Sequence, residues 1–391
     1  MTDPEAEQVP RIVHVTADVI PELGSAYTAI PRLCGLLRSP EFDVELLTTH
    51  EPGTAPRTEH RNGFPASTFP KDRWGAAIGK SGAMSAELKR MALQSALLHV
   101  HGLWRLCSVD ALHIARRRGL PAILSPMGAF APAALRHSRF RKLAFWHGLQ
   151  KSSLRGVACF HATSDAELDD IRAMGIRGPV AVIPLGVDTP AIAPVQSAAS
   201  PSRTVLFLGR ISPIKNLLSL MSAWRSIQAR FPDARLRMVG PDDRGHVETV
   251  RRAIESSGAA RVSIEPGVWG AERDEAYAQS DVVVLPSYSE SFGLVVAEAL
   301  AAGRPVIAST GSPWQLLERE SCGWWVDPTA GALAGAMADA LSLPPRDLGE
   351  MGSRGRQLAE RELGWSSRLP SFLRMYQWVL GGGSPPEFVS T

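Results

Sequence analysis

Short apolar or β-branched runs alternate with amphipathic segments along most of the chain. Apolar runs at residues 11–19, 42–50, 97–104, 121–128, 156–164 and 179–188 predict the strands of a first sheet. A second set begins at residue 204 and continues at residues 234–242, 261–268, 281–288, 304–310 and 322–328. Segments with helical spacing, such as 84–97 and 165–175, lie between them. Strand–helix alternation of this kind predicts an α/β protein built from parallel sheets.

The runs divide into two sets of similar size, which indicates two Rossmann-like domains. We expect an N-terminal domain over residues 1–190, a linker rich in Pro, Ala and Ser over 191–203 and a C-terminal domain over 204–360. Closing helices are expected in the last segment, 361–391, with its final residues frayed. Open parallel sheets bind ligands at the carboxyl ends of their strands, so two facing domains would form a central cleft.

The composition narrows the class of protein. The chain has 391 residues, of which 45% are hydrophobic and 21% charged, as in soluble globular proteins. No apolar run approaches the ~20 residues of a membrane-spanning helix, and the first residues do not resemble a secretory signal, so we expect a cytoplasmic protein. The net charge of +3 does not favour nucleic acid as a partner.

The chain has four cysteines, and they lie singly inside apolar segments. No CxxC pair and no Cys/His metal spacing occurs. We therefore expect that they are reduced core residues that neither bind zinc nor form disulfides. They are Cys34, Cys107, Cys159 and Cys322.

Two glutamates flank a glycine turn directly after the apolar run at 282–285. Glu290 is expected in the loop and Glu298 about two turns into a helix that Gly303 ends. The amides near Gly293 would then lie at the helix N-terminus, where they favour an anion or a dense set of hydroxyls. The other interpretation is that Glu290 only caps the helix and Glu298 is solvated.

A pair of cations follows the first strand of the same domain. Arg210 and Lys215 lie in the loop between the run at 204–208 and the next helical segment. Two cations at the carboxyl end of a strand can hold a diphosphate and neutralise its charge as it leaves. A solvated pair is the alternative interpretation.

Together these motifs resemble a known family. FLGRISPIKN (207–216), PSYSESFG (286–293) with Glu298, and GRPVIAS (303–309), in this order and spacing, resemble the retaining glycosyltransferases of family 4, the glycosyl transferases group 1. The resemblance implies the GT-B fold, with two facing Rossmann-like domains and a central cleft. It also implies sugar transfer from a nucleotide-diphosphate donor without a metal or a further cofactor.

The resemblance assigns roles to residues of the second domain. It implies that Arg210 and Lys215 bind the donor diphosphate, Glu298 the ribose hydroxyls, and Glu290 the transferred sugar. Further donor-binding positions are Val268 and Trp269 beside the base, and the loop residues Ser291, Phe292, Gly293 and Leu294. Ser291 departs from the glycine that is common in the family, which we expect to affect the choice of donor.

The first domain carries matching positions. HGLW (101–104) resembles a branch that assembles bacterial surface polysaccharides, and the resemblance implies that His101 contacts the donor sugar. A lone histidine is otherwise more often structural. We expect His99 to point into the domain, on the ground that neighbouring strand residues alternate. Gly24 and Ser25 stand where the family has a glycine pair against the leaving phosphate.

Two further features concern the acceptor. Met127 replaces a basic residue of the resembling branch, so the acceptor is expected to differ. The segment 135–156 mixes cations with aromatic residues and is suited to an anionic membrane surface or a lipid pyrophosphate, with a solvated helix face as the alternative. Its candidate acceptor or membrane residues are Arg136, Arg139, Arg141 and Lys142.

The sequence thus predicts a retaining, metal-independent glycosyltransferase that uses a nucleotide sugar. Its acceptor would be a glycan or a polyprenyl-diphosphate-linked sugar in exopolysaccharide, capsule or lipopolysaccharide assembly at the inner face of the plasma membrane. In the front-face mechanism usual for the family, the leaving phosphate takes the proton of the acceptor, and no side chain need act as base.

Three alternatives remain open. The first is a GT-B sugar-nucleotide epimerase, which needs no acceptor. The second is a binding module that has lost catalysis, against which the intact cations and glutamates argue. An NAD-dependent enzyme is disfavoured because no G-x-G-x-x-G follows the first strand.

Overall fold

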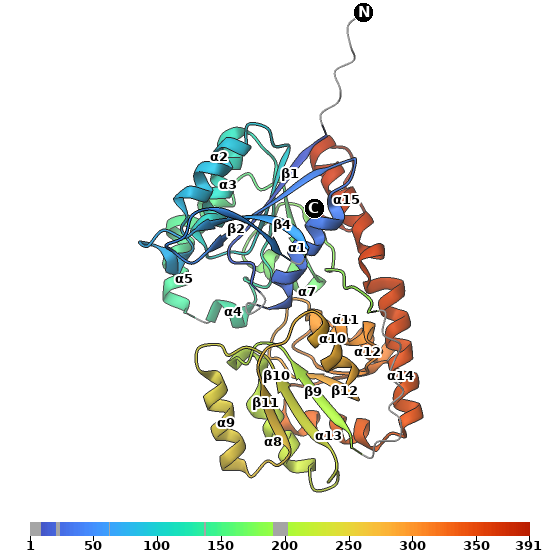
Figure 1. Cartoon of the computed structure of the whole chain (residues 1–391). Helices are drawn as coiled ribbons and strands as arrows, with labels where there is room; N and C mark the ends of the chain where they lie inside the picture. The colour runs from blue at the N-terminus through green and yellow to red at the C-terminus, as the bar shows by residue number, and fades with distance from the viewer. Residues whose placement is uncertain (1–8, 21–23, 62, 137, 191–201) are drawn as a thin grey trace, which may run out of the picture. The chain divides into compact units, whose positions relative to one another are not determined.

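The computed structural model describes residues 9–20, 24–61, 63–136, 138–190 and 202–391 (Figure 1). The chain divides into two compact units. Unit 1 consists of Met1–Ile20, Ala26–Ile183 and Leu369–Thr391, and unit 2 of Pro21–Ser25 and Pro184–Arg368. Of the predicted linker, 191–203, only Ser202 and Arg203 lie within the described residues.

Unit 1 is built on a nine-stranded sheet with the order β15-β8-β7-β6-β5-β1-β2-β4-β3. The pairs β3–β4 and β15–β8 are antiparallel, and the other pairs are parallel. The strands are β1 Arg11–Thr16, β2 Asp43–His50, β3 Arg57–Arg61, β4 Phe64–Pro70, β5 Leu97–His101, β6 Ala122–Ser125, β7 Cys159–Ala162, β8 Val180–Val182 and β15 Val389–Ser390.

The central strands of this sheet are buried on both faces, and most of their residues are apolar. Every residue of β5 is buried, as in β6 and β7. This is the pattern of parallel strands covered by helices. The main helices of the unit are α1 Ser25–Leu37, α2 Gly82–Met91, α3 Leu106–Arg118, α4 Pro132–Arg136, α5 Arg139–Phe145, α6 Lys151–Ser153 and α7 Asp165–Ala173. A π-helical turn, η3 Trp146–Gln150, joins α5 to α6, and a 3₁₀ turn, η2 Ala76–Ile78, precedes α2.

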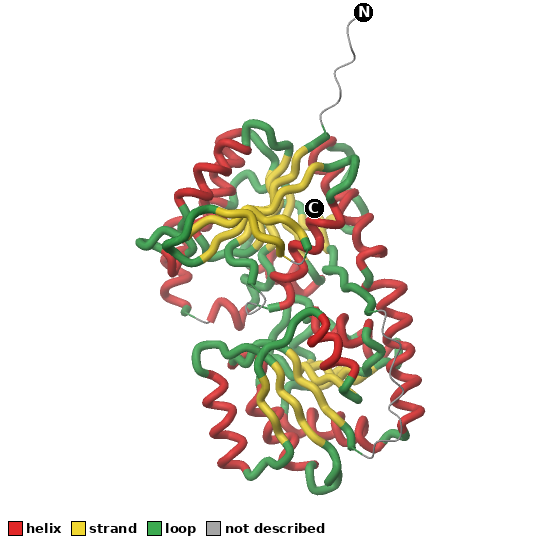
Figure 2. The backbone as a smooth tube through the Cα atoms, in the orientation of Figure 1, coloured by secondary structure: helices red, strands yellow, loops and turns green. Residues whose placement is uncertain are grey.

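Unit 2 contains a six-stranded sheet of parallel strands with the order β11-β10-β9-β12-β13-β14. Numbered within the unit, this is 3-2-1-4-5-6, the Rossmann order. The strands are β9 Thr204–Leu208, β10 Arg235–Val239, β11 Val262–Glu265, β12 Val282–Leu285, β13 Val306–Ser309 and β14 Gly323–Val326. Figure 2 shows helices flanking these strands.

The helices of unit 2 follow the strands in alternation, as the sequence predicts. They are α8 Leu217–Ile227, α9 His246–Ser257, α10 Ala271–Ala278, α11 Leu294–Ala301, α12 Leu316–Arg319, α13 Ala330–Ser342 and α14 Pro345–Leu358, with short turns η4 Pro213–Lys215 and η5 Ala359–Leu363. Buried apolar side chains such as Leu220, Trp224 and Met337 join α8 and α13 to the sheet.

The C-terminal segment differs from the expectation of a frayed end. Helix α15, Trp365–Gly381, is followed by β15, whose Val389 pairs with Ala181 of β8. Arg374 also donates to Glu387 at 2.7 Å, which fixes the tail against α15. The division between the units falls inside this helix, after Arg368.

Besides β15, the strands β3 and β4 were not predicted. Arg57–Arg61 is polar and mostly exposed, so its sequence does not carry the apolar signal of a core strand. It is an antiparallel edge strand held by β4.

The four cysteines are free and buried, which confirms their place in the core. Burial raises the pKa of Cys159 to about 12 and that of Cys107 to about 11, so these thiols stay protonated. Among the described residues, no helix is long and apolar enough to cross a membrane.

Candidate functional site

The switch point of the unit 2 sheet lies between β9 and β12, the neighbours at which the strand order reverses. The loop after β9 carries Arg210 and Lys215, and the loop after β12 carries Glu290. The two loops are tied together by hydrogen bonds from the amide of Tyr288 to Ile214 O at 2.9 Å and from Asn216 Nδ2 to Pro286 O at 3.0 Å. The sheet topology therefore brings both predicted motifs to one place.

Lys215 and Glu290 form an ion pair at this switch point, between Nζ and Oε1. Each side chain is only 14% exposed. Ser287 Oγ donates to the same carboxylate oxygen at 2.6 Å. The interpretation of Lys215 as a solvated cation is therefore wrong, and so is a purely local capping role for Glu290. An ammonium group has three donors, so Lys215 can hold Glu290 and still donate to a ligand.

The turn that follows Glu290 exposes backbone donors. Gly293 has φ +79° and precedes α11, and a Cβ at this position would lie 3.0 Å from Leu285 Cδ2. Phe292 O accepts a hydrogen bond from Trp314 Nε1, which fixes the turn. The amides of Phe292, Gly293 and Leu294 donate to no other group among the described residues. These donors at a helix N-terminus suit an anion or hydroxyl groups.

Glu298 is buried, with 8% exposure, so its interpretation as a solvated residue is wrong. Helix α11 begins at Leu294, which places Glu298 little more than one turn from the helix start, closer than predicted. Arg273 Nη1 donates to Oε1 at 2.9 Å, and the hydroxyl of Tyr277 donates to Oε2 at 2.9 Å. Burial raises the pKa of Glu298, while Arg273 and Tyr277 act in the opposite direction.

Arg273 and Tyr277 were not found by sequence reasoning. Both lie on α10, which carries no phosphate-binding or carboxylate-binding motif. A signal was present in their spacing, since residues four apart lie on one face of a helix. Glu298, the partner of both residues, lies on another helix, so the contact could not be predicted from local sequence.

Arg210 lies in the loop after β9 and is about one-third exposed. Its Nη1 lies 3.7 Å from Asp243 Oδ2, a loose pair that leaves other guanidinium donors available. The backbone is closely packed where this loop begins: a Cβ on Gly240 would lie 1.8 Å from Gly209 O. The amide of Ile211 donates to Pro241 O at 2.9 Å, which further fixes the loop.

The remaining donor-binding candidates lie in two loops of unit 2. Trp269 is 38% exposed, and its ring packs against Gly267, where a Cβ would lie 2.8 Å from Cη2. Val268 is half-buried beside it, and Ser291 lies half-buried in the turn after Glu290. A partly exposed indole is suited to stacking against a base.

Unit 1 has its own switch point, between β1 and β5. His101 ends β5 and is paired in register with Thr16, the last residue of β1. Gly24 and Ser25 are grouped with unit 2: Gly24 has φ +116° and directly precedes Ser25, the first residue of α1. The side chain of Ser25 lies outside the described residues. His101 therefore stands where a ligand of an open α/β sheet is expected.

His99 lies inside the domain, as predicted, but the reason given for its direction, alternation with His101, is wrong. Strand residues two apart point to the same face, so His99 shares a face with His101. The two rings are stacked with centroids 4.1 Å apart. Nitrogens of His14, His99 and His101 lie within 4.8 Å of one another, a group that could hold a metal ion. The sequence did not suggest this cluster, and metal independence stays a prediction.

Met127 occupies a strained turn after β6. Its φ is +56° and Gly128 follows with φ +75°. The amide of Gly128 donates to Glu167 Oε1 at 2.6 Å, and Thr163 N donates to Oε2 at 2.8 Å. Glu167, which the sequence did not single out, thus holds the loop that carries Met127.

The basic and aromatic segment of unit 1 borders a cavity of about 310 Å³. Lys142 donates to Ala134 O and lies 5.6 Å above the ring of Trp104. Burial lowers the pKa of Lys142. Phe140 is 85% exposed. The lining residues are Trp104, Leu135, Arg136, Arg139, Lys142, Leu143, Trp146, His147 and Met174. Arg141 belongs to the same helix, α5, but does not line the cavity.

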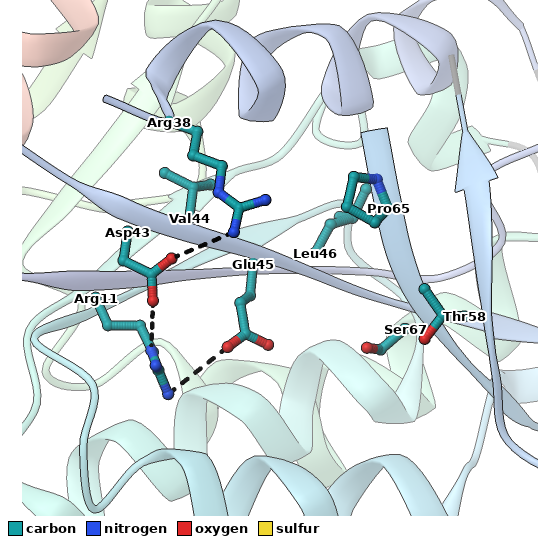
Figure 3. Close-up of a pocket in the computed structure, with 9 residues that line it drawn as sticks. All are labelled: Arg11, Arg38, Asp43, Val44, Glu45, Leu46, Thr58, Pro65 and Ser67. Carbon is teal, nitrogen blue, oxygen red and sulfur yellow. Dashed lines mark hydrogen bonds and ion pairs between the residues drawn. The ribbon is translucent and has the colours of Figure 1, made fainter. Parts of the chain in front are cut away.

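A second cavity of unit 1, of about 290 Å³, lies toward the amino ends of β1 and β2 (Figure 3). Its charges pair with one another: Arg11 Nε lies 2.9 Å from Asp43 and its Nη1 3.6 Å from Glu45. Figure 3 shows Asp43 between Arg11 and Arg38. Ligands of parallel sheets bind at the opposite, carboxyl ends, so we assign this cavity no part in the site.

Comparison with known families decides the class of protein. Residues 188–358 match the model of glycosyl transferases group 1, and residues 25–186 match that of the glycosyl transferase 4-like domain. The chain thus carries a glycosyl transferases group 1 domain and a glycosyl transferase 4-like domain. The predicted family is thereby confirmed, and its surface-polysaccharide branch stays a prediction.

A curated relative of this chain is named as a glycosyltransferase. A D-inositol 3-phosphate glycosyltransferase of Segniliparus rotundus is 33% identical over 216 residues, which are 52% of this chain and 48% of that protein. The chain thus spans about half the length of this curated relative.

Solved structures share the fold. Sucrose-phosphate synthase from Thermosynechococcus elongatus superposes with a TM-score of 0.77 at 21% identity, covering 96% of this chain and 100% of that one. HepE of Anabaena, solved with UDP and glucose, gives 0.74 at 16% identity, covering 94% and 99%. The predicted α/β, GT-B fold class is confirmed.

Proposed function

We propose that this glycosyltransferase moves a sugar from a nucleotide-diphosphate sugar to an acceptor, with retention of configuration and without a metal. The observation that carries the proposal is the pairing of Lys215 with Glu290 beside the unpaired amides of Phe292, Gly293 and Leu294. A cation, an acceptor oxygen and backbone donors at one switch point match the groups of a sugar diphosphate.

Unit 2 would bind the donor. Arg210 and Lys215 would contact the diphosphate, and Trp269 would stack on the base beside Val268. Glu298 would accept hydrogen bonds from the ribose hydroxyls, since Arg273 and Tyr277 favour its ionised form against the effect of burial and leave it further lone pairs. Glu290 would bind hydroxyls of the transferred sugar, with Ser291 beside it influencing donor choice.

The chemical step would be a front-face transfer. The bond from the anomeric carbon to the leaving phosphate oxygen breaks, the acceptor oxygen attacks from the same face, and its proton passes to that phosphate. Lys215 and the amides at α11 would stabilise the charge that develops on the diphosphate. His101 would contact the donor sugar, and Gly24 and Ser25 would approach the leaving phosphate.

Unit 1 would bind the acceptor. The cavity beside α5 combines Arg136, Arg139 and Lys142 with an apolar floor, which suits an anionic amphiphile such as a polyprenyl-diphosphate-linked sugar. Arg141 and the exposed Phe140 would face the inner surface of the plasma membrane, and Met127 would touch the acceptor. Such an acceptor fits polysaccharide assembly, and a solvated helix face is the competing interpretation.

Calorimetric titration tests the donor site. UDP, GDP, ADP and their common sugar conjugates are titrated into the wild type, Glu298→Ala and the control Glu350→Ala, which alters an exposed ion pair on α14. We expect one nucleotide diphosphate to bind the wild type and the control, and to bind Glu298→Ala about 10- to 100-fold more weakly. No binding by the folded wild type would contradict the proposal and favour a non-catalytic module.

Product analysis separates transfer from epimerisation. The bound nucleotide sugar is incubated with the protein, with and without a detergent extract of lipid-linked sugars. We expect acceptor-dependent release of nucleotide diphosphate. Formation of an altered nucleotide sugar or a free sugar without acceptor would favour the epimerase.

A further inference from the structure

A chain of buried hydrogen bonds crosses unit 1 and ends at His101. It begins at the carbonyl of Ile183, which lies 2.7 Å from His161 Nε2. His161 Nδ1 lies 2.7 Å from Ser125 Oγ, and Ser125 Oγ lies 2.8 Å from His99 Nε2. These side chains lie on the neighbouring strands β7, β6 and β5.

The chain continues through helix α15. His99 Nδ1 lies 2.7 Å from the hydroxyl of Tyr376, and that hydroxyl lies 3.4 Å from His14 Nε2. His14 Nδ1 then lies 2.9 Å from His101 Nε2. The four residues are at most 3% exposed, so water cannot replace these partners.

The first link fixes the direction of the bonds nearest to it. A carbonyl can only accept, so His161 carries its proton on Nε2 and its Nδ1 accepts. Ser125 must therefore donate to His161, and its oxygen accepts from His99 Nε2. His99 is then unprotonated at Nδ1, which accepts from the hydroxyl of Tyr376.

The directions of the remaining bonds, up to His101, follow in turn. Having donated to His99, the hydroxyl of Tyr376 accepts from His14 Nε2. His14 is then unprotonated at Nδ1, which accepts from His101 Nε2. His101 is therefore the Nε2–H tautomer, and its Nδ1 keeps a lone pair.

These bond directions hold for neutral side chains, and burial keeps every member neutral. It lowers the pKa of His14 to about 3 and of His161 to about 4, and it lowers the pKa of His99 and of His101 well below the ordinary value. Burial also raises the pKa of Tyr376, so the hydroxyl stays a donor.

The end of the chain keeps polar atoms without a partner. His101 Nδ1 has no hydrogen-bond partner among the described residues. Thr16, paired in register with His101 and thus on the same face of the sheet, has a buried Oγ1 that also lacks a partner in the described part of the chain. An acceptor and a hydroxyl left unpaired together point to a ligand that carries hydroxyls.

From this geometry we infer that the chain from Ile183 to His101 fixes the tautomer of His101, so that Nδ1 accepts a hydrogen bond from a hydroxyl of the sugar substrate. Tyr376 is then a positioning residue that acts through His14. The inference rests on the proposed function for the identity of the hydroxyl, but not for the tautomer itself.

A metal ion among His14, His99 and His101 is the rival use of the same nitrogens. The metal would need the Nδ1 lone pairs of His99 and His14, which accept hydrogen bonds from Tyr376 and His101. The proton on His101 Nε2 would then lose its acceptor. The complete sequence of donors and acceptors favours the hydrogen-bonded chain.

The tautomers can be measured directly. Long-range ¹H–¹⁵N spectra of the full chain labelled with ¹⁵N-histidine distinguish Nδ1–H from Nε2–H, and the His101→Gln variant assigns the signal. We expect the Nε2–H tautomer for His14, His99, His101 and His161. An Nδ1–H tautomer for His101, or signals that shift to metal-bound values on addition of zinc, would overturn the inference.

A matched pair of variants tests the role of Tyr376. Tyr376→Phe removes only the hydroxyl, whereas Met375→Leu changes a buried neighbour on the same helix that has no part in the chain. We expect Tyr376→Phe to mix the tautomers of His101 and to lower kcat about 3- to 10-fold, with the affinity for nucleotide diphosphate unchanged. Met375→Leu should change neither the spectrum nor kcat.

The failure of this inference differs from failure of the proposed function. Unchanged tautomers and an unchanged kcat in Tyr376→Phe, with an active wild type, would overturn the inference alone. A wild type with the expected tautomers but no transfer of sugar would contradict the proposed function and the role of Nδ1. Only the inferred tautomers of the histidines would then stand.

Discussion

Lys215 and Glu290, 75 positions apart in the sequence, form an ion pair at the switch point of the unit 2 sheet. The pair exists because β9 and β12 are neighbours, so the loops that follow them meet. Before a donor binds, Glu290 thus supplies the counter-charge that holds Lys215 in place. Its second oxygen, Oε2, accepts no hydrogen bond from the described residues and is available to a sugar hydroxyl.

Removing the ammonium group should abolish most of the activity. In Lys215→Met, the leaving diphosphate loses a cation and Glu290 keeps a nearly buried charge without its partner. We expect kcat/KM for the nucleotide sugar to fall about 100-fold or more. The assay is release of nucleotide diphosphate, with Lys89→Met, an exposed lysine on α2, as the control. Normal turnover by Lys215→Met would contradict the assignment of the diphosphate site.

The environment of Glu298 predicts a pH dependence of donor binding. Burial raises the pKa of Glu298, and the hydrogen bond from Tyr277 lowers it. Only the ionised carboxylate can accept from both ribose hydroxyls, so affinity is lost as the pH falls through this pKa. In Tyr277→Phe the pKa rises further, and the loss should begin at a higher pH than in the wild type.

Calorimetry of nucleotide diphosphate between pH 7.5 and about 5 measures this effect. The wild type titrated over the same range corrects for protonation of the phosphate. When Glu298→Gln is introduced into both the wild type and Tyr277→Phe, the difference in affinity between the two should disappear. Parallel pH profiles for the wild type and Tyr277→Phe would show that the hydroxyl does not act on Glu298.

The sequence was most informative about the strands and the residue types at their carboxyl ends. Arg210, Lys215 and Glu290 could be placed in strand-to-helix loops because apolar runs mark where β9 and β12 end. Their pairing could not be predicted, since strand order is a property of the whole sheet. Arg273 and Tyr277 were missed because their partner, Glu298, lies on a different helix.

Two errors have local physical causes. His99 and His101 were assigned opposite directions, although residues two apart in a strand share a face. The tail was expected to fray because its glycines and prolines indicate no regular element. It is held instead by contacts that local sequence cannot reveal, such as that of Arg172 Nη2 with Ser390 O at 3.0 Å.

The buried histidines predict acid sensitivity of unit 1. The native pKa of His14 is about 3 and that of His161 about 4, against 6.5 for an ordinary histidine. Below pH 6.5 the unfolded chain therefore binds more protons than the native protein, and the free energy of unfolding decreases as the pH falls. Near pH 5 each such histidine contributes a slope of about 1.4 kcal/mol per pH unit.

Urea unfolding followed between pH 7 and 5 gives this slope. His161→Gln should take up about one proton fewer on unfolding at pH 5. His60→Gln, at an exposed position of β3, should leave the slope unchanged. A wild-type stability that is independent of pH over this range would mean that the cluster is not buried as described.

The basic segment of unit 1 predicts binding to anionic membranes. Phe140 is 85% exposed beside Arg139 on α5, so an aromatic ring and a cation are presented together. Because each cation near an anionic surface contributes about 1 kcal/mol, Arg139→Ser should weaken binding to phosphatidylglycerol vesicles about fivefold at low salt. Phe140→Ser should also weaken it, by loss of apolar contact with the lipid.

Sedimentation with vesicles tests this in the full chain. Phosphatidylcholine vesicles should bind weakly, and added salt should reduce binding to the anionic ones. Arg117→Ser, an exposed cation at the end of α3, serves as the matched control and should behave as the wild type. Equal weakening by Arg139→Ser and Arg117→Ser would indicate a general effect of net charge, and no binding by the wild type would favour a solvated helix face. In that case the cavity beside α5 would have to be assessed as a site for a water-soluble acceptor.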